Sequence, residues 1–196
     1  MKNLLAFLFT VLLAINVQAQ NPEDYYYQIP DYPESYTPGN VAARMMDGLG
    51  FRYYWATTGL RDEDLAYKPS EEARTSEETI DHILGLTNVV LNSVKKVPTD
   101  FTKPQEELNY DQKRAKTLQN IREASDILKS ATEKDFSEFK IIFIGSRGTS
   151  EYPFWNQLNG PIADALWHVG QVVSFRRSSG NPFTSEVSVL RGRVRE

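Results

Sequence analysis

Residues 75–94 read "TSEETIDHILGLTNVVLNSV", and this stretch decides the fold class. Thr75 and Glu78 form a capping box, because the threonine hydroxyl can accept the third backbone amide while the glutamate carboxylate returns to the threonine amide. Side chains suited to one buried stripe then recur every three or four residues, at Ile80, Ile83, Leu84, Thr87, Leu91 and Val94. Such a stripe is typical of an amphipathic helix. The sequence therefore predicts a helix that begins after Thr75 and ends before Pro98.

Three further segments have the same helical period. They lie at about residues 40–59, 111–132 and 154–178. In the first, Asn40 is the expected N-cap and Gly59 closes the helix. In the last, Pro161 either kinks the helix or restarts it at a first-turn position, and Gly180 supplies a left-handed stop.

A long connection, residues 136–154, separates the third and fourth helices. It contains a short β-prone run at residues 140–144, followed by glycine and serine, so a small hairpin could form there. Four helices of comparable length are most simply packed as a four-helix bundle with functional groups pointing inward. We therefore expect an all-α fold with a long crossover before the last helix.

The chain opens with "MKNLLAFLFTVLLAINVQAQ", which predicts a secretory signal peptide over residues 1–19 and a secreted or periplasmic protein. Residues 20–38 are rich in proline, acid and tyrosine, have neither the helical nor the strand period, and are expected to form an extended arm. This arm is either a solvated linker or a segment whose rings, such as Tyr25, Tyr27 and Tyr32, lie on the domain surface. Residues 39–182 form the helical domain, and residues 183–196 form a C-terminal tail with a solvated basic end.

Composition excludes several classes of protein. The chain has no cysteine, which rules out disulfides and cysteine-based catalysis or zinc binding. The net charge is −4 and no basic stripe interleaved with aromatics is present, so nucleic acid is not the expected partner. After the leader, no segment is apolar over the roughly 20 residues that a membrane span needs.

Two histidines and an aspartate are the candidate metal ligands. Asp164 and His168 are four residues apart and share one face of the last helix, while the only other histidine, His82, lies one turn into the helix that follows Thr75. Two imidazoles and a carboxylate suit Zn²⁺, Ni²⁺, Fe²⁺ or Mn²⁺, and three protein ligands leave positions open for water or substrate. From spacing alone, packed histidines with hydrogen-bond partners remain the alternative.

The segments "LRDEDLAYKPSEEARTSEETIDHI" and "ADALWHVGQVVSFRRSSGNP" together resemble the DinB / YfiT-like superfamily of metal-binding helical bundles. The similarity covers about residues 40–182. In the first segment, the family has a connection between its first two helices, followed by a helix that carries the first metal-binding histidine. This part of the family pattern corresponds to Tyr67, Lys68, Pro69, Ser76 and His82. In the second, the family pattern H-x-x-H-H-R-G-Q maps onto Asp164, Trp167, His168, Val169, Gly170 and Gln171.

This resemblance implies a divalent ion held by His82, Asp164 and His168, and a homodimer as the oligomeric state. The chain departs from the family where Asp164 replaces a histidine. An aspartate has a shorter reach and lowers the positive charge of the site, which weakens the acidifying effect of the ion on bound water. The alternative is a decayed site in which Asp164 pairs with a cation such as Arg52.

Several side chains near these ligands are candidates for the surroundings of the site. Gln171, three residues after His168, could hydrogen-bond a ligand or a bound water, or it could be a buried polar residue with a backbone partner. Trp167 is the other candidate for contact with a cofactor. The chain has three tryptophans, which are Trp55, Trp155 and Trp167. They either line a pocket or belong to the core. Arg176 and Arg177 suit the negative end of the last helix dipole, or an anionic substrate.

Three functions are compatible with these residues. The first is a metal-dependent enzyme of transferase or hydrolase type acting on a small molecule, and the resemblance adds thiol transfer to the candidate reactions. Because low-molecular-weight thiols are kept reduced mainly inside cells, export favours hydrolysis instead. The second is a non-catalytic module that binds a small ligand or serves a stress response, and the third is an interaction protein. No separate nucleophile or general base stands out in the sequence. Glu77, Glu78 and Asp81 lie near His82, but acids at the start of a helix usually stabilise the helix dipole.

Overall fold

The computed structural model describes residues 22–195, so the signal peptide expected over residues 1–19 lies outside the described residues. The described chain is mostly helical. The helices are α1 (Pro38–Thr57), α2 (Asp62–Leu65), α3 (Ser76–Val94), α4 (Tyr110–Ser130), α5 (Glu133–Glu138), α6 (Trp155–Gln157) and α7 (Ala163–Ser178), with a 3-10 helix η1 (Pro22–Tyr27) and a π-helical turn η2 (Leu158–Ile162). The strands are β1 (Thr99–Asp100), β2 (Ile141–Gly145), β3 (Gly148–Tyr152), β4 (Val187–Ser188) and β5 (Arg193–Val194).

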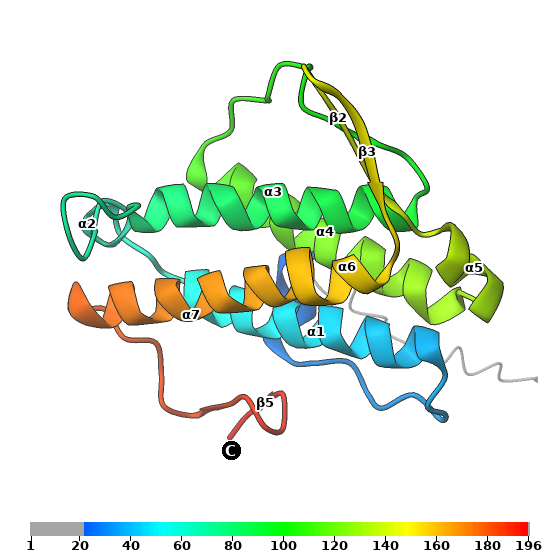
Figure 1. The fold of residues 1–196 in the computed structure, drawn as a ribbon. Coiled ribbons are helices and arrows are strands. Elements are labelled where there is room, and N and C mark those ends of the chain that lie inside the picture. The colour runs from blue at the N-terminus through cyan, green and yellow to red at the C-terminus, as the bar shows by residue number, and fades with distance from the viewer. Residues whose placement is uncertain (1–21, 196) are drawn as a thin grey trace, which may run out of the picture.

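Four long helices lie side by side and enclose one apolar core (Figure 1). Helix α1 packs against α4 and α7, and α3 packs against the same two helices. The core residues without exposed surface include Met46, Leu49, Tyr53, Ile80, Ile83, Val90, Ile121, Leu128 and Ile162. Burial of these apolar stripes supplies the main stabilisation of the helices, since isolated helices of this length are marginal in water.

The capping box at the start of α3 is confirmed. The Glu78 amide donates to Thr75 Oγ1 at 3.1 Å, and the Thr75 amide donates to Glu78 Oε2 at 2.7 Å. Helix α1 begins earlier than predicted, because Thr37 rather than Asn40 is its N-cap and accepts the Asn40 amide at 3.1 Å. Pro38 occupies the first helical turn, where its missing N–H costs nothing.

The predicted fourth helix is interrupted at Pro161. Pro161 has no N–H to continue the hydrogen-bond ladder, and Gly160 takes a non-helical conformation with φ −96° and ψ −110°. The result is the π-helical turn η2 between α6 and α7, a form of irregularity that often occurs at functional sites. Gly180 has a φ of +84°, as expected for the residue that stops α7.

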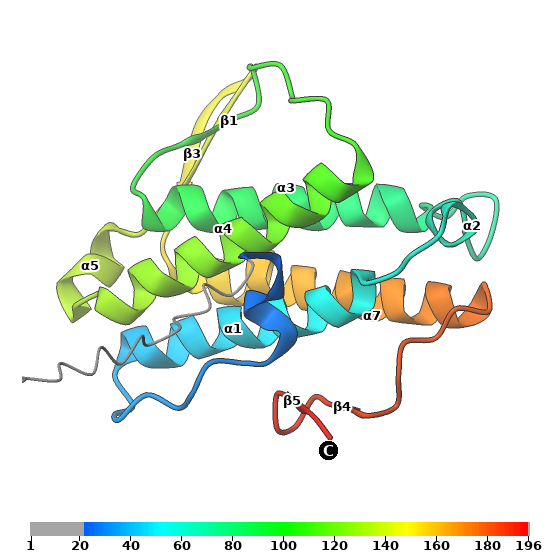
Figure 2. The same ribbon diagram turned by 180° about the vertical axis from the view of Figure 1, so that it is seen from behind.

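The crossover before α6 contains the hairpin that the sequence suggested. Strands β2 and β3 pair antiparallel, and β1 adds to β2 in parallel, so the sheet order is β1-β2-β3. This small sheet projects beyond α3 (Figures 1 and 2). A strictly all-α description is therefore wrong, although the helices carry the core.

The N-terminal arm is packed on the domain, and its first described part is the 3-10 helix η1 and not the extended chain that was expected. Tyr26 is 1% exposed, and its hydroxyl donates to Asp47 Oδ1 at 3.1 Å. Its ring lies against Gly50, where a Cβ would approach the ring to 2.6 Å, so glycine is required there. Tyr25 is half-buried, whereas Tyr32 is exposed. These contacts favour the surface-packed arm over the solvated linker.

The C-terminal tail also contacts the arm. Strands β4 and β5 form a short hairpin, and the Ile29 amide donates to the Gly192 carbonyl at 2.9 Å. Arg193 donates to the Ile29 carbonyl and, at 2.7 Å, to Asp31 Oδ1. The expectation of a wholly solvated basic end is therefore wrong for Arg193, because the arm supplies acceptors that the sequence pattern did not indicate.

Arg176 lies in the last turn of α7, as expected for a cation at the negative end of the helix dipole, but it is buried and joins α7 to the end of α1. It is 2% exposed, and its Nη1 donates to the carbonyl oxygens of Trp55, Ala56 and Thr58 at 3.0 Å each. These carbonyls lie at the C-terminus of α1, where the helix has no internal donors left. Arg177 is exposed. The anionic-substrate alternative is not supported for Arg176, because its guanidinium is buried and donates to backbone carbonyls.

Asp64 of α2 completes the same junction. Its side chain has no exposed surface and accepts hydrogen bonds from Arg61, Ser179 and Asn181. The hydrogen bond from Arg61 contributes most to a pKa of Asp64 well below the usual range of an aspartate, followed by the bond from Ser179, while burial opposes both.

Among residues 22–195, no helix is long and apolar enough to span a membrane.

Candidate metal centre

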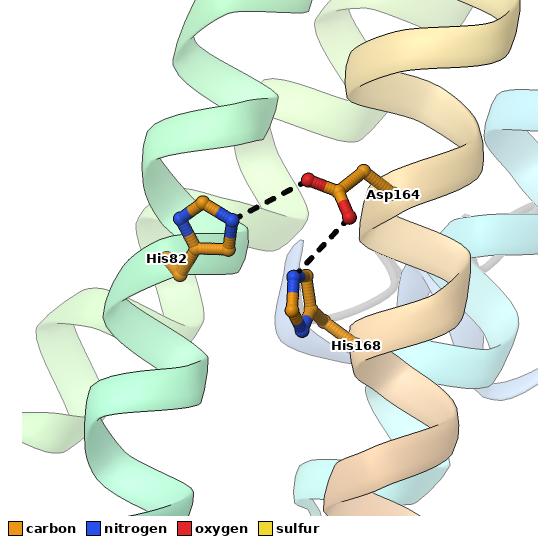
Figure 3. A group of neighbouring side chains, drawn as sticks. All are labelled: His82, Asp164 and His168. Carbon is orange, nitrogen blue, oxygen red and sulfur yellow. Dashed lines mark ion pairs between the residues drawn. The ribbon is translucent and has the colours of Figure 1, made fainter. Parts of the chain in front are cut away.

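The three predicted ligands meet between α3 and α7. His82 projects from the second turn of α3, and Asp164 and His168 project from successive turns of α7 (Figure 3). The spacing of four residues on α7 stacks Asp164 above His168, and the packing of α7 on α3 brings His82 to both. Residues far apart in the sequence are thus assembled by the two helices.

The donor atoms are close enough to share one ion. His82 Nε2 lies 3.4 Å from Asp164 Oδ2, and His168 Nε2 lies 3.2 Å from Asp164 Oδ1. One ligand atom from each residue can be chosen so that all three lie within 4.8 Å of one another. A tetrahedral ion with bonds of about 2.0–2.1 Å needs ligand atoms about 3.3 Å apart. The cluster could therefore bind a metal ion after small side-chain adjustments.

The cluster is open to solvent on one side. The side chains of His82 and Asp164 are 34% and 36% exposed, while that of His168 is 14% exposed. Three donors with one accessible side correspond to a catalytic type of metal site, which keeps a position for water or substrate. A closed structural site would need a fourth protein donor. Among the described residues, the group of candidate ligands at this place has three members.

The two imidazoles are held against each other. Their ring centroids are 4.6 Å apart and the rings are nearly perpendicular, at 85°. Partial burial lowers the pKa of His82, and the positive charge of Arg74 and the electrostatic effect of the neighbouring His168 lower it further, while Asp164 acts in the opposite direction. The neutral imidazole is the form that binds a metal. The surroundings of His82 therefore favour its ligand form.

Gln171 orients His168. His168 Nδ1 lies 2.7 Å from Gln171 Oε1. Because the amide oxygen only accepts, this contact assigns the proton to Nδ1 in the neutral ring and leaves the lone pair of Nε2 facing Asp164. Metal-bound histidines usually donate their second N–H in this way. Of the two interpretations of Gln171, the contact with a candidate ligand agrees with the structure.

The interpretation of Asp164 as a partner of Arg52 is wrong. Arg52 Nη1 donates to the Gly48 carbonyl one turn earlier in α1, at 3.0 Å. The carboxylate of Asp164 instead lies within ion-pair distance of His82 and His168. Both histidines of the chain thus share the same carboxylate.

Two of the tryptophans are exposed. Trp155 and Trp167 are 74% and 72% exposed, so neither belongs to the core. The core interpretation fails because both side chains project away from the buried sides of their helices. Trp55 is partly buried, packs against the core, and donates from Nε1 to the Tyr27 carbonyl at 3.2 Å. A role for Trp167 in binding a cofactor stays a prediction.

The acidic residues beside His82 in the sequence have other partners. Glu77 and Asp81 pair with Lys113 at 3.0 and 2.8 Å, and Glu78 caps the helix. These acids therefore serve the helix start and its packing on α4, as the sequence indicated. Arg74, whose positive charge affects His82, was not marked by any motif, because it lies in an irregular segment just before the N-cap.

Comparison with known proteins does not identify a family. No protein-family model, no curated protein and no solved structure matches this chain.

Proposed function

We propose that this chain is a metal-dependent enzyme of transferase or hydrolase type, built as a four-helix bundle of the DinB / YfiT-like kind. The packing of α1, α3, α4 and α7 around one core supports the bundle. The observation that carries the function is the convergence of His82, Asp164 and His168 within 4.8 Å. Such a donor set fits Zn²⁺, Ni²⁺, Fe²⁺ or Mn²⁺.

Each residue of the cluster has a distinct task in this proposal. His82 and His168 provide neutral nitrogen donors from two different helices. Asp164 provides an oxygen donor and a negative charge, while Gln171 holds the His168 ring in one tautomer and orientation. A divalent ion at this place supplies Lewis acidity, which polarises a substrate oxygen or activates a water or a thiol.

The solvent-exposed side of the cluster determines which molecules can reach the three side chains. His82 and Asp164 are each about one-third exposed, so a small molecule can approach the donor set from outside the helices. Glu77, Glu78 and Asp81 have other partners, and we therefore assign no separate general base. The proposed export of the chain makes water a more available nucleophile than a reduced thiol.

An assay of the metal-loaded protein tests this proposal. Purified protein is loaded in turn with Zn²⁺, Ni²⁺, Fe²⁺ and Mn²⁺ and is assayed for ester, amide and phosphoester hydrolysis and for thiol transfer to an electrophilic arene. We expect turnover that is lost on chelation and in His168→Ala. Absence of turnover with every metal, although the metal is bound, would refute the enzymatic part.

A second candidate is a non-catalytic small-ligand module with a degenerate metal site. The observation that favours it is the position of Asp164, which can pair with both imidazoles without any ion when either is protonated. This candidate predicts a chain that takes up no metal and whose melting temperature does not respond to a chelator.

A further inference from the structure

A second cavity lies away from the metal cluster, where α1 begins. Its volume is about 610 Å³, within the range of small-molecule sites. Its walls come from the end of the N-terminal arm, the first two turns of α1, helix α5, and the segment that leads into α6 and η2. Four aromatic rings line it, from Tyr36, Phe136, Phe154 and Trp155.

Exposed apolar side chains gather around this cavity. Trp155 is 74% exposed, Tyr36 98%, Val41 49% and Met45 37%. Single exposed apolar residues are ordinary on a protein surface, but several around one hollow are typical of a binding site. Phe136 and Phe154 pack edge to face beneath them, with ring centroids 4.8 Å apart. The cavity therefore offers aromatic faces to a ligand.

The charge of the cavity has one sign. Among the described residues that line it, Glu133 has the only charged side chain. Among residues 22–195, no cation lies within 4.0 Å of the Glu133 carboxylate, although other exposed glutamates of the chain, such as Glu138, have lysine partners. Aromatic faces and an unpaired carboxylate both attract a positive charge.

Nearby positive groups do not reverse this preference. The start of α1 offers little to an anion, since Pro38 has no amide hydrogen and Thr37 accepts the Asn40 amide. Arg44 lines the adjoining cavity of about 460 Å³, where its guanidinium lies 4.8 Å from the Tyr32 ring centre and donates to the Pro30 carbonyl.

We propose that this cavity binds a small apolar cation, an aryl- or alkylammonium. Its apolar part lies against the rings of Phe136, Phe154 and Trp155, and its charge lies near Glu133. This site is independent of the metal chemistry proposed above, because none of its lining residues belongs to the cluster of His82, Asp164 and His168.

Calorimetric titration with phenyltrimethylammonium tests the proposal. Its neutral isostere, tert-butylbenzene, differs only in the replacement of the charged nitrogen by carbon. Both titrations include a chelator, so that the outcome does not depend on the metal cluster. We expect the ammonium to bind about fivefold more tightly than the isostere, which corresponds to a cation–π and carboxylate contribution of about 1 kcal/mol. Equal affinities, tighter binding of the isostere, or no binding of the ammonium would overturn the proposal.

Two pairs of variants locate the site. Trp155→Ala removes a ring of the cavity, and Trp167→Ala removes an equally exposed tryptophan elsewhere. Glu133→Gln removes the carboxylate, and Glu72→Gln removes an exposed carboxylate outside the cavity. We expect Trp155→Ala and Glu133→Gln to weaken ammonium binding about two- to fivefold, with no effect of the controls. Equal effects in both members of a pair would contradict the assignment.

Discussion

Two aspartates of this molecule, Asp64 and Asp164, have opposite surroundings. Asp64 has no exposed side-chain surface and accepts hydrogen bonds from Arg61, Ser179 and Asn181. These bonds tie α2 to the end of α7. Asp64 thus has its lone pairs occupied by donors of the chain itself, which is the expected state of a buried carboxylate with a structural role.

The side chain of Asp164 is about one-third exposed, and its carboxylate lies 3.4 Å from His82 and 3.2 Å from His168. In the tautomer that Gln171 favours for His168, two acceptors, Nε2 and the carboxylate, point toward each other. Acceptors that converge without a donor between them are stabilised by a proton or a cation. The candidate metal site therefore differs from the structural junction, because the carboxylate of Asp164 lacks the complete set of hydrogen-bond donors that surrounds Asp64.

The largest expected effect is the loss of stability when Asp64 is replaced. We expect Asp64→Asn to lower the free energy of unfolding by about 3 kcal/mol, because the buried amide keeps one acceptor oxygen where the carboxylate has two, and its NH₂ group then faces the donors of Arg61, Ser179 or Asn181. For a chain of this size, that corresponds to a fall in melting temperature of about 6–12 °C. Thermal unfolding measures it, with the exposed Asp62→Asn as the control. A change below about 1 kcal/mol would contradict the role of this junction.

The same variant gives a pH prediction. The pKa of Asp64 is well below its value in the unfolded chain, so its contribution to stability is present above about pH 4 and is lost as the pH falls below that value. The stability difference between the wild type and Asp64→Asn is therefore expected to be constant from pH 8 to about pH 5 and to shrink below about pH 4. Urea unfolding at several pH values measures this difference, and an equal difference at pH 3 would refute it.

The next-largest expected effect is the stabilisation of the protein by Zn²⁺ at the cluster of His82, Asp164 and His168. Zn²⁺ at a hundred times its dissociation constant is expected to add about 2.7 kcal/mol to the stability of the wild type, and a chelator is expected to remove it. His82→Ala abolishes this shift, while Asp81→Asn, which changes an adjacent carboxylate that faces Lys113, retains it. Thermal melts with and without Zn²⁺ measure both. A shift of the same size in His82→Ala would place the ion elsewhere.

The smallest effect concerns the orientation of His168. We expect Gln171→Leu to weaken Zn²⁺ binding at least about tenfold, because the ring loses the acceptor that fixes its tautomer. Gln171→Glu keeps an acceptor for the same N–H and is expected to keep the affinity. Competition with a chromophoric chelator measures the dissociation constants. Equal affinities in wild type and Gln171→Leu would show that Gln171 has no orienting role.

Local signals predicted much of the helical structure. The capping box of Thr75 and Glu78 and the left-handed position of Gly180 depend on a few neighbouring residues, and both are confirmed. The interval of four residues on one helix likewise predicted that Asp164 and His168 would lie together. His82 approaches this pair because α3 packs on α7. The bundle hypothesis predicted that packing, whereas the helical periods alone did not.

Other features depend on contacts between distant segments, which periodicity does not report. Arg176 is buried because it donates to the open carbonyls of α1, a contact that its place in the last turn of α7 did not indicate. Tyr26 is buried because Gly50 leaves room for its ring. Trp155 and Trp167 are exposed despite their size. For Arg176 and Tyr26, the environment of the side chain is set by residues that are distant in the sequence.

The metal content of the purified protein tests the central claim most directly. Elemental analysis is carried out on the wild type, on His168→Ala and on Trp155→Ala after incubation with Zn²⁺ and removal of free ion. We predict about one ion per chain in the wild type and in Trp155→Ala, and none in His168→Ala. A wild type that retains no ion, or a His168→Ala variant with the wild-type content, would contradict it.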